Sequence, residues 1–137
     1  MFKETITYED YNGVERTEDF YFNLSKTELV ELELNSSGEK FSDRVQRMID
    51  ANDKEDIITE VKNIILLAYG EKSSDGRRFE KSPEITKAFS QTPAFDILYM
   101  KLLNDDEYAS KFITDLVPKS LMAEVEKQKA ISISNKE

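Results

Sequence analysis

The most chemically varied stretch of the sequence is AYGEKSSDGRRFEKSPE, residues 68–84. It combines two glycines and two adjacent arginines with serines and acids. A phosphate-binding loop of the usual kind follows a strand and has a lysine and a hydroxyl residue at the start of the next helix. Here the first glycine, Gly70, follows a predicted helix and is placed to end it as a left-handed cap, and no Gly-Lys-Ser triplet occurs. The stretch therefore lacks the pattern of a phosphate-binding loop.

The centre of this stretch has the residues of a tight turn. Asp75 and Gly76 separate GEKSS from RRFEKS, and these residue types favour turns. We predict a small turn or hairpin here, with Phe79 returning to the core. A contact of Arg77 and Arg78 with an anion or a partner protein is the alternative.

Two clusters of acids have the side chains for acid–base work or metal binding, NDDE at 104–107 and DKED at 53–56. Both lie at predicted helix starts, where acids interact favourably with the helix dipole. Such clusters are also expected by chance in a chain with 28 acids, and no array of oxygen ligands at loop spacing indicates magnesium or calcium. We predict no catalytic, cofactor-binding or metal-binding residue.

The chain has no histidine and no cysteine. This excludes disulfides, thiolate or imidazole metal sites, and Ser/His or Cys/His nucleophilic pairs. No apolar run approaches the roughly 20 residues that cross a bilayer, and the N-terminal MFKETITYED has no signal-peptide core. We therefore expect an intracellular protein that is not an enzyme and does not span a membrane.

The net charge of the 137-residue chain is −9, from 28 acidic and 19 basic residues. The bases are dispersed, so nucleic acid and anionic membranes are disfavoured as partners. An acidic surface suits solubility and a basic protein partner.

A β-hairpin is predicted at the start of the chain. Strand-forming residues lie on both sides of Asn12-Gly13, a dipeptide that supplies the two positive φ angles of a type I′ turn. The strands should lie near 3–10 and 15–23. Two strands alone are marginal in water, so the hairpin must pack on helices or pair with another chain.

Capping residues and apolar spacing predict the helices that follow. Ser25 and Glu28 form a capping box for a helix at about 26–34, and Asp53 is placed to cap a later one. Ser82-Pro83 and Thr92-Pro93 each combine a cap with proline at the first helical position. The apolar stripes consist of Phe41, Val45, Met48 and Ile49; Ile57, Ile58, Val61, Ile64, Ile65 and Ala68; Phe95, Leu98, Tyr99, Leu102 and Leu103; and Tyr108, Phe112, Ile113 and Leu116.

The expected fold is mainly α, of the α+β class, with an N-terminal β-hairpin followed by a bundle of about five or six short helices. We expect a single domain over residues 1–118, with the hairpin at 2–23 and helices over about 26–117. Residues 119–137 should form a C-terminal helix and a frayed tail.

The aromatic run Phe20, Tyr21, Phe22 suggests where partners could bind. In a strand Phe20 and Phe22 face one side and Tyr21 the other. Either the first side packs on the helices while Tyr21 and Tyr11 cover the second, or another subunit completes the exposed face or edge. We predict partner contacts from the hairpin and from the helix near 95–103, through Tyr8, Tyr11, Tyr21, Phe95, Leu98, Tyr99 and Leu102.

Three segments carry a resemblance to a known family: TITYEDYNGVERTEDFYFNLSKTEL, AYGEKSSDGRRFEKSPEITKAFSQTPAFDILY and KFITDLVP. Together they span nearly all of residues 1–118. In these segments the chain resembles the tail-assembly chaperone-like proteins of long-tailed phages and prophages of Gram-positive bacteria. The resemblance implies a non-enzymatic protein of the host bacterial cytoplasm. It implies a protein that coats the tape measure protein, helps the tail tube polymerise around it, and is absent from the mature virion.

Several copies are expected to self-associate through head-to-tail contacts. The main alternative function is a structural tail or connector component that is retained in the virion, although such proteins commonly have larger sheets than one hairpin. An acidic DNA mimic would have its acids in spaced rows, whereas these acids alternate with lysines and arginines.

Overall fold

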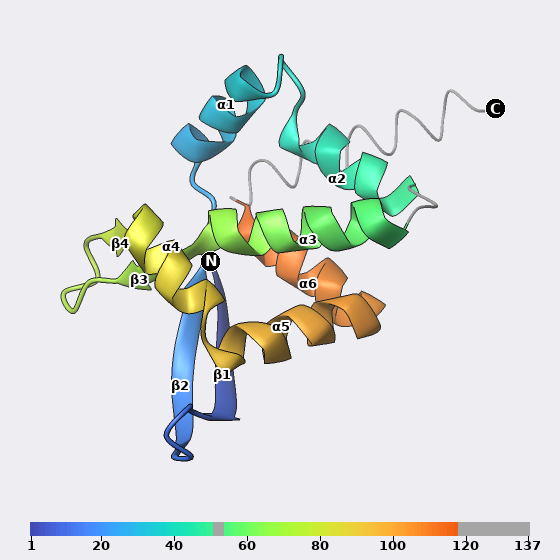
Figure 1. Cartoon of the computed structure of the whole chain (residues 1–137). Coiled ribbons are helices and arrows are strands. Elements are labelled where there is room, and N and C mark those ends of the chain that lie inside the picture. Colours follow the sequence, from blue (N-terminus) through green and yellow to red (C-terminus); the bar gives the residue numbers. More distant parts are fainter. Residues whose placement is uncertain (51–53, 118–137) are drawn as a thin grey trace.

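The computed structural model describes residues 1–50 and 54–117. It shows a long β-hairpin, six helices and a short second hairpin between the third and fourth helices (Figure 1). The prediction of an α+β fold with an N-terminal hairpin is confirmed. The predicted cap Asp53 and the predicted C-terminal helix and tail at 119–137 lie outside the described residues.

The elements follow one another closely along the chain. The strands are β1 Phe2–Glu9, β2 Glu15–Phe22, β3 Tyr69–Lys72 and β4 Phe79–Glu80. The helices are α1 Lys26–Asn35, α2 Phe41–Asp50, α3 Lys54–Ala68, α4 Pro83–Ser90, α5 Pro93–Asn104 and α6 Asp106–Leu116.

The predicted helix caps are confirmed where the structure describes them. Ser25 accepts a hydrogen bond from the backbone N–H of Glu28, whose carboxylate accepts from the N–H of Ser25, so the capping box is complete. Ser82, Thr92 and Asp105 each accept from the N–H three residues later. These bonds satisfy backbone donors that have no partner within their helix.

The two hairpins join into one antiparallel sheet in the order β1-β2-β3-β4. Phe2 pairs with Phe22 across the first hairpin, and Tyr21 and Phe22 then pair with Gly70 and Tyr69 of β3. The predicted turn at Asp75-Gly76 is confirmed as the connection between β3 and β4. The sheet is therefore larger than the single hairpin that the sequence indicates.

The prediction that Gly70 ends a helix in a left-handed conformation is wrong. Gly70 lies within β3 and has no positive φ. A Cβ atom there would lie 2.6 Å from a ring carbon of Phe79 and 2.9 Å from the carbonyl oxygen of Glu80. Glycine is thus required for the close approach of β4. Phe79 is half-buried and covers Gly70, instead of entering the core as predicted.

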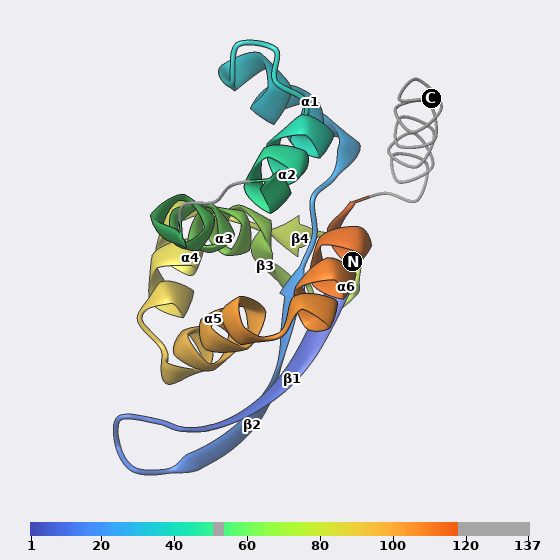
Figure 2. The same ribbon diagram turned by 90° about the vertical axis from the view of Figure 1, so that its right-hand side faces the viewer.

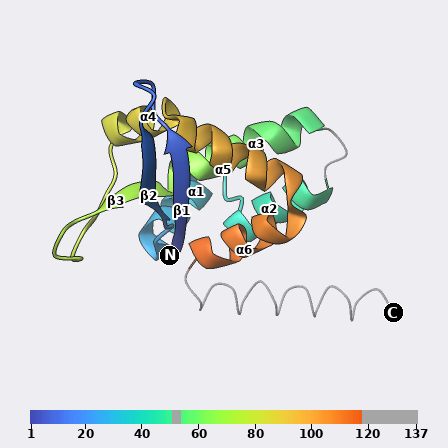
Figure 3. The same ribbon diagram turned by 90° about the horizontal axis from the view of Figure 1, so that it is seen from below.

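Helices cover only one face of the long hairpin. Figure 3 shows α3, α5 and α6 to one side of β1 and β2, and both α5 and α6 contact β1. Figure 2 shows the hairpin curving beneath α5. The inner face carries the buried side chains Phe2, Ile6, Phe20 and Phe22, so the predicted burial of Phe20 and Phe22 on one side is confirmed.

An aromatic cluster joins this inner face to the helices. The fully buried ring of Phe22 contacts Phe2, Tyr69, Phe89 and Phe112 at centroid distances of 5.5–6.3 Å. Tyr69 stacks on Phe89 of α4 at 3.9 Å. These ring contacts therefore join β1 and β2 to β3, α4 and α6 in one aromatic cluster.

Most of the predicted helix stripes lie in the core or against it. Ile64, Ile65 and Ala68 of α3 are buried, as are Phe112 and Leu116 of α6. Ile58 is an exception, because its side chain is 39% exposed. Its place in the predicted stripe is wrong: α3 is buried along its C-terminal half, whereas Ile58 lies near its exposed N-terminal end.

We expect Phe22→Ala to lower the free energy of unfolding by about 3–5 kcal/mol, because the variant leaves a cavity among four aromatic neighbours. Tyr21→Ala on the opposite face is the control, with an expected loss of about 1 kcal/mol. Urea denaturation measures both. Equal losses for the two variants would contradict the assignment of the two faces.

Candidate interaction surfaces

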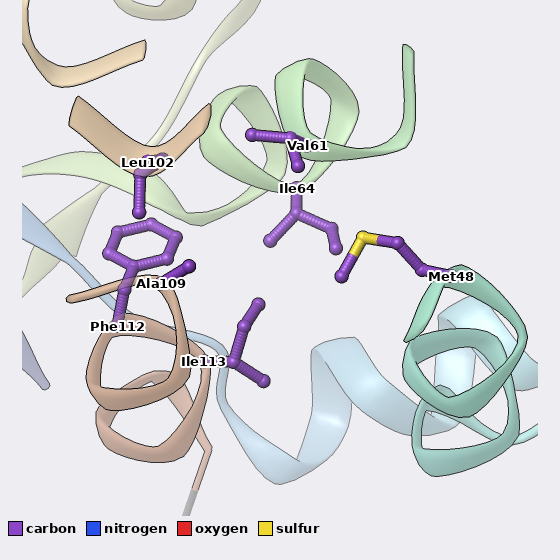
Figure 4. A pocket seen from close by; sticks show the side chains of 7 residues that line it. All are labelled: Met48, Val61, Ile64, Leu102, Ala109, Phe112 and Ile113. Atoms are coloured by element: carbon purple, nitrogen blue, oxygen red, sulfur yellow. The ribbon is translucent and has the colours of Figure 1, made fainter. Parts of the chain in front are cut away.

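The described residues contain no group that suggests metal or small-molecule chemistry. None of their His, Cys, Asp or Glu residues form a group of three or more that could hold a metal ion. Figure 4 shows an apolar crevice between α2, α3, α5 and α6, lined by Met48, Val61, Ile64, Leu102, Ala109, Phe112 and Ile113. Its volume of about 20 Å³ is close to that of one water molecule. The candidate site must therefore lie on the surface.

Among the residues that the structure describes, no helix combines the length and the apolar character needed to cross a membrane.

Large apolar side chains are exposed in pairs at three places, in addition to Met1, Ile58 and Leu67. Tyr11 and Val14 lie at the tip of the long hairpin, Val30 and Leu34 on α1, and Ile97 and Met100 on α5. Of these six residues, only Tyr11 is in the predicted partner set. The signal for Val30 and Leu34 was their spacing of four residues, on a helix that also contains Leu29 and Leu32.

The three hairpin tyrosines predicted to contact partners differ in environment. Tyr11 is 82% exposed at the tip, so the prediction that it covers the outer face of the sheet is wrong. Tyr21 does lie on the outer face, half-buried, with the Lys72 ammonium 5.1 Å from its ring centroid. Tyr8 lies on the inner face, where its ring contacts Phe20 and its hydroxyl donates to Glu18.

The predicted contacts on α5 fall mostly on core residues. Phe95, Leu98 and Leu102 are buried. Tyr99 is half-buried, stacks on Phe95 at 5.8 Å and donates to the carbonyl of Ile58. On the folded domain, the apolar side chains of α5 that a partner can reach are Ile97, 44% exposed, and Met100, 52% exposed.

The outer face of the long hairpin is polar. Thr5 donates to Asp19 at 2.6 Å, and Thr7 and Thr17 share a hydrogen bond of 2.9 Å. Within the described residues, β1 is an edge strand and β2 pairs with β3 only at its last two residues, so most of the long hairpin has no further strand paired to either of its edges. Such edges can pair with a further strand. The outer face of the hairpin offers a partner few apolar contacts, so the edges are the better docking surface.

The tip of the hairpin is a three-residue loop with a bulge, and not the predicted type I′ turn. Asp10 and Val14 are hydrogen-bonded across the loop, and Gly13 has a φ of 79° while Asn12 has no positive φ. The Asp10 carboxylate explains this choice, because it accepts from the N–H groups of Asn12 and Val14 and from Arg16 Nε at 2.6 Å. The hydrogen bond from Arg16, followed by that from Val14, lowers the pKa of Asp10.

A second polar contact clamps β1 to α5 and α6. Lys101 Nζ lies 4.0 Å from the ring centroid of Tyr108 and 3.2 Å from the Glu4 carboxylate. Burial, and then the charge of Glu4, raises the pKa of the Tyr108 hydroxyl. The tyrosine therefore stays protonated at neutral pH, and the arrangement is suited to structure and not to nucleophilic chemistry.

Lys81 anchors the N-terminal end of α1. Its ammonium donates to the carbonyl of Asn23 at 2.7 Å, the carboxylate of Glu28 at 2.5 Å and the carbonyl of Leu67 at 3.0 Å. One side chain thus joins the end of β2, the first turn of α1 and the end of α3. This contact holds α1 to the body of the domain and helps to keep its outer side chains exposed.

A family model described as phage tail assembly chaperone matches residues 1–137 of the chain. No curated protein matches the chain, and no solved structure matches it.

We expect Lys81→Met to lower the free energy of unfolding by about 2–4 kcal/mol, because two backbone carbonyls and a carboxylate lose a charged donor. Chemical denaturation measures the loss. Lys3→Met is the matched control: Lys3 makes an exposed ion pair with Asp19 at 3.6 Å, and exposed pairs contribute little. A loss no larger than that of the control would show that Lys81 is not an anchor.

We expect the hairpin tip to loosen in acid. A carboxyl group whose folded pKa is lowered stabilises the fold above its unfolded pKa, near 3.8 for Asp10, and this stabilisation is lost as the pH falls through the lower folded value. A titration of the Asp10 carboxyl carbon by NMR should give a pKa below 3.8. Arg16→Gln should raise it. A wild-type pKa at or above 3.8 would contradict the hydrogen bonds described for the tip.

Proposed function

Because the chain belongs to the phage tail assembly chaperone family, we propose that it is a non-enzymatic chaperone that coats the tape measure protein. It promotes assembly of the tail tube from the major tail protein in the host bacterial cytoplasm, and it leaves before the virion is complete. The family match over residues 1–137 carries this proposal.

The surface of the domain supports this function. A long apolar client helix aggregates in water unless another protein covers it, and a protein that covers it must itself stay soluble. The chain has a net charge of −9 and exposes apolar side chains in small separate groups. Several copies that each make a modest contact can hold such a client firmly and still release it stepwise.

We also propose that the chaperone self-associates into a ring or an open spiral. The free edges of β1 and β2 support this, since strand pairing needs only backbone groups and head-to-tail contacts generate such assemblies. Of the predicted contact residues, Tyr11 is exposed at the tip of the hairpin, and a partner can reach part of the half-buried Tyr8, Tyr21 and Tyr99 on the folded domain. Phe95, Leu98 and Leu102 would act by holding α5 in place.

We expect co-expression with the tape measure protein of the same phage to move that protein from the insoluble to the soluble fraction. The two should then copurify in a complex with several chaperone copies per client. Size-exclusion chromatography with light scattering measures the stoichiometry. Lys111→Gln serves as a control variant, because it changes one exposed charge on α6 and adds no apolar group.

A strictly monomeric chaperone at high concentration, with no complex on co-expression, would contradict the proposal. Mass spectrometry of purified virions distinguishes the chaperone function from the alternative function, because a structural tail or connector component would be found in the finished particle.

A further inference from the structure

Helix α1 has apolar side chains on both of its sides. Leu29 is buried and Leu32 is half-buried against the body of the domain. Val30 is 56% exposed and Leu34 is 74% exposed, and their spacing of four residues makes them neighbours on the outer side. Exposed apolar side chains that are neighbours can mark a site where a partner binds. In the part of the chain that the structure describes, Val30 and Leu34 have no cover on this side.

The charges beside the C-terminal part of this outer side are negative, whereas Lys26 lies four residues before Val30 at its other end. Glu33 lies three residues after Val30, and Glu31 three residues before Leu34, so each apolar side chain has a carboxylate as its helical neighbour. The lysine of α1, Lys26, is at its first position, and the last turn has no base. The negative end of the helix dipole lies at this same end. Glu33, in the last turn, is therefore placed where the helix dipole disfavours a negative charge unless a cation approaches.

We propose that the outer side of α1, formed by Val30 and Leu34 with Glu31 and Glu33, binds an apolar helix of a partner protein whose apolar stripe is flanked by lysines or arginines. The partner's apolar side chains pack on Val30 and Leu34. Its bases pair with the two glutamates and meet the negative end of the dipole. The inference rests on the proposed function in taking this helix to be a segment of the chaperone's client.

The same charges disfavour a second copy of this chain as the occupant. Two α1 helices that pair through their outer sides would bring four glutamates together, and like charges at such distances repel. The position of α1 also favours a client. Figures 1 and 2 show α1 at the end of the domain opposite the tip of the long hairpin, so strand pairing through the hairpin leaves α1 free.

The length of α1 sets how much client each copy covers. Ten residues span about 15 Å of helix. One copy therefore contacts about three turns of an antiparallel or parallel client helix, and many copies are needed along a long client.

A synthetic helix of about 20 residues tests the proposal. The probe carries leucine at the a and d positions of its heptads and lysine at e and g, and a matched peptide carries glutamate at e and g. Fluorescence anisotropy with the full chain should show tight binding of the lysine peptide only. Val30→Ser/Leu34→Ser should weaken that binding about tenfold or more, and Glu31→Lys/Glu33→Lys should reverse the preference between the two peptides.

Ile97→Ser/Met100→Ser is the matched control, because it removes two comparably exposed apolar groups from α5. It should leave the affinity within about twofold. Circular dichroism checks that each variant is folded, and if the serine pair on α1 is not, the charge-reversal pair decides. The proposal is overturned if the wild type binds neither peptide, if the α5 variant loses as much affinity, or if charge reversal changes nothing.

Co-expression of the same variants with the tape measure protein separates this inference from the proposed function. If the wild-type chain leaves the client insoluble, the proposed function is contradicted, and the peptide result still decides the role of α1. If Val30→Ser/Leu34→Ser stays folded and solubilises the client to the same extent as the wild type does, the inference about α1 is contradicted and the proposed function is not.

Discussion

The burial of Phe22 is the contact on which the rest of the structure depends. A two-stranded hairpin is marginal in water, and this one gains its support where Phe22 and its aromatic neighbours meet α4, α6 and β3. The same residue also pairs with Tyr69 through the backbone, so the sheet and the helical core meet at one position. The strands and helices are therefore stable together and weak apart.

The remaining polar anchors are arranged around this aromatic core. Lys81 ties α1 to the ends of β2 and α3, and Lys101 ties β1 to α5 and α6. Each uses one lysine to satisfy groups from elements that are distant in the chain. These contacts hold the outer elements in position, and the surface of the domain stays rich in charge. The chain belongs to the phage tail assembly chaperone family, and an acidic surface with a few fixed apolar groups is compatible with the function proposed above.

The sequence predicted those features that depend on local chemistry. The caps at Ser25, Ser82 and Thr92 are decided by a side chain and an N–H three residues away, and all are present. The placement of Phe20 and Phe22 on one face, with Tyr21 on the other, follows from strand alternation alone.

The features that the sequence did not predict depend on distant neighbours. Gly70 lies in a strand because β4 approaches it, and the hairpin tip is set by a carboxylate outside the Asn-Gly pair. Likewise, the apolar stripe of α5 faces inward, and which apolar residues remain outside depends on where α3 and α6 pack. Spacing identifies a stripe but does not say which side of a helix meets solvent. The long hairpin illustrates a last consequence of such distant contacts: α5 and α6 contact β1, and only the last two residues of β2 pair with β3, so the tip of the hairpin is the free end of an arm. If copies join through such arms, as proposed above, they would be able to tilt against one another without disturbing their cores, and the proposed assembly could follow a client that bends.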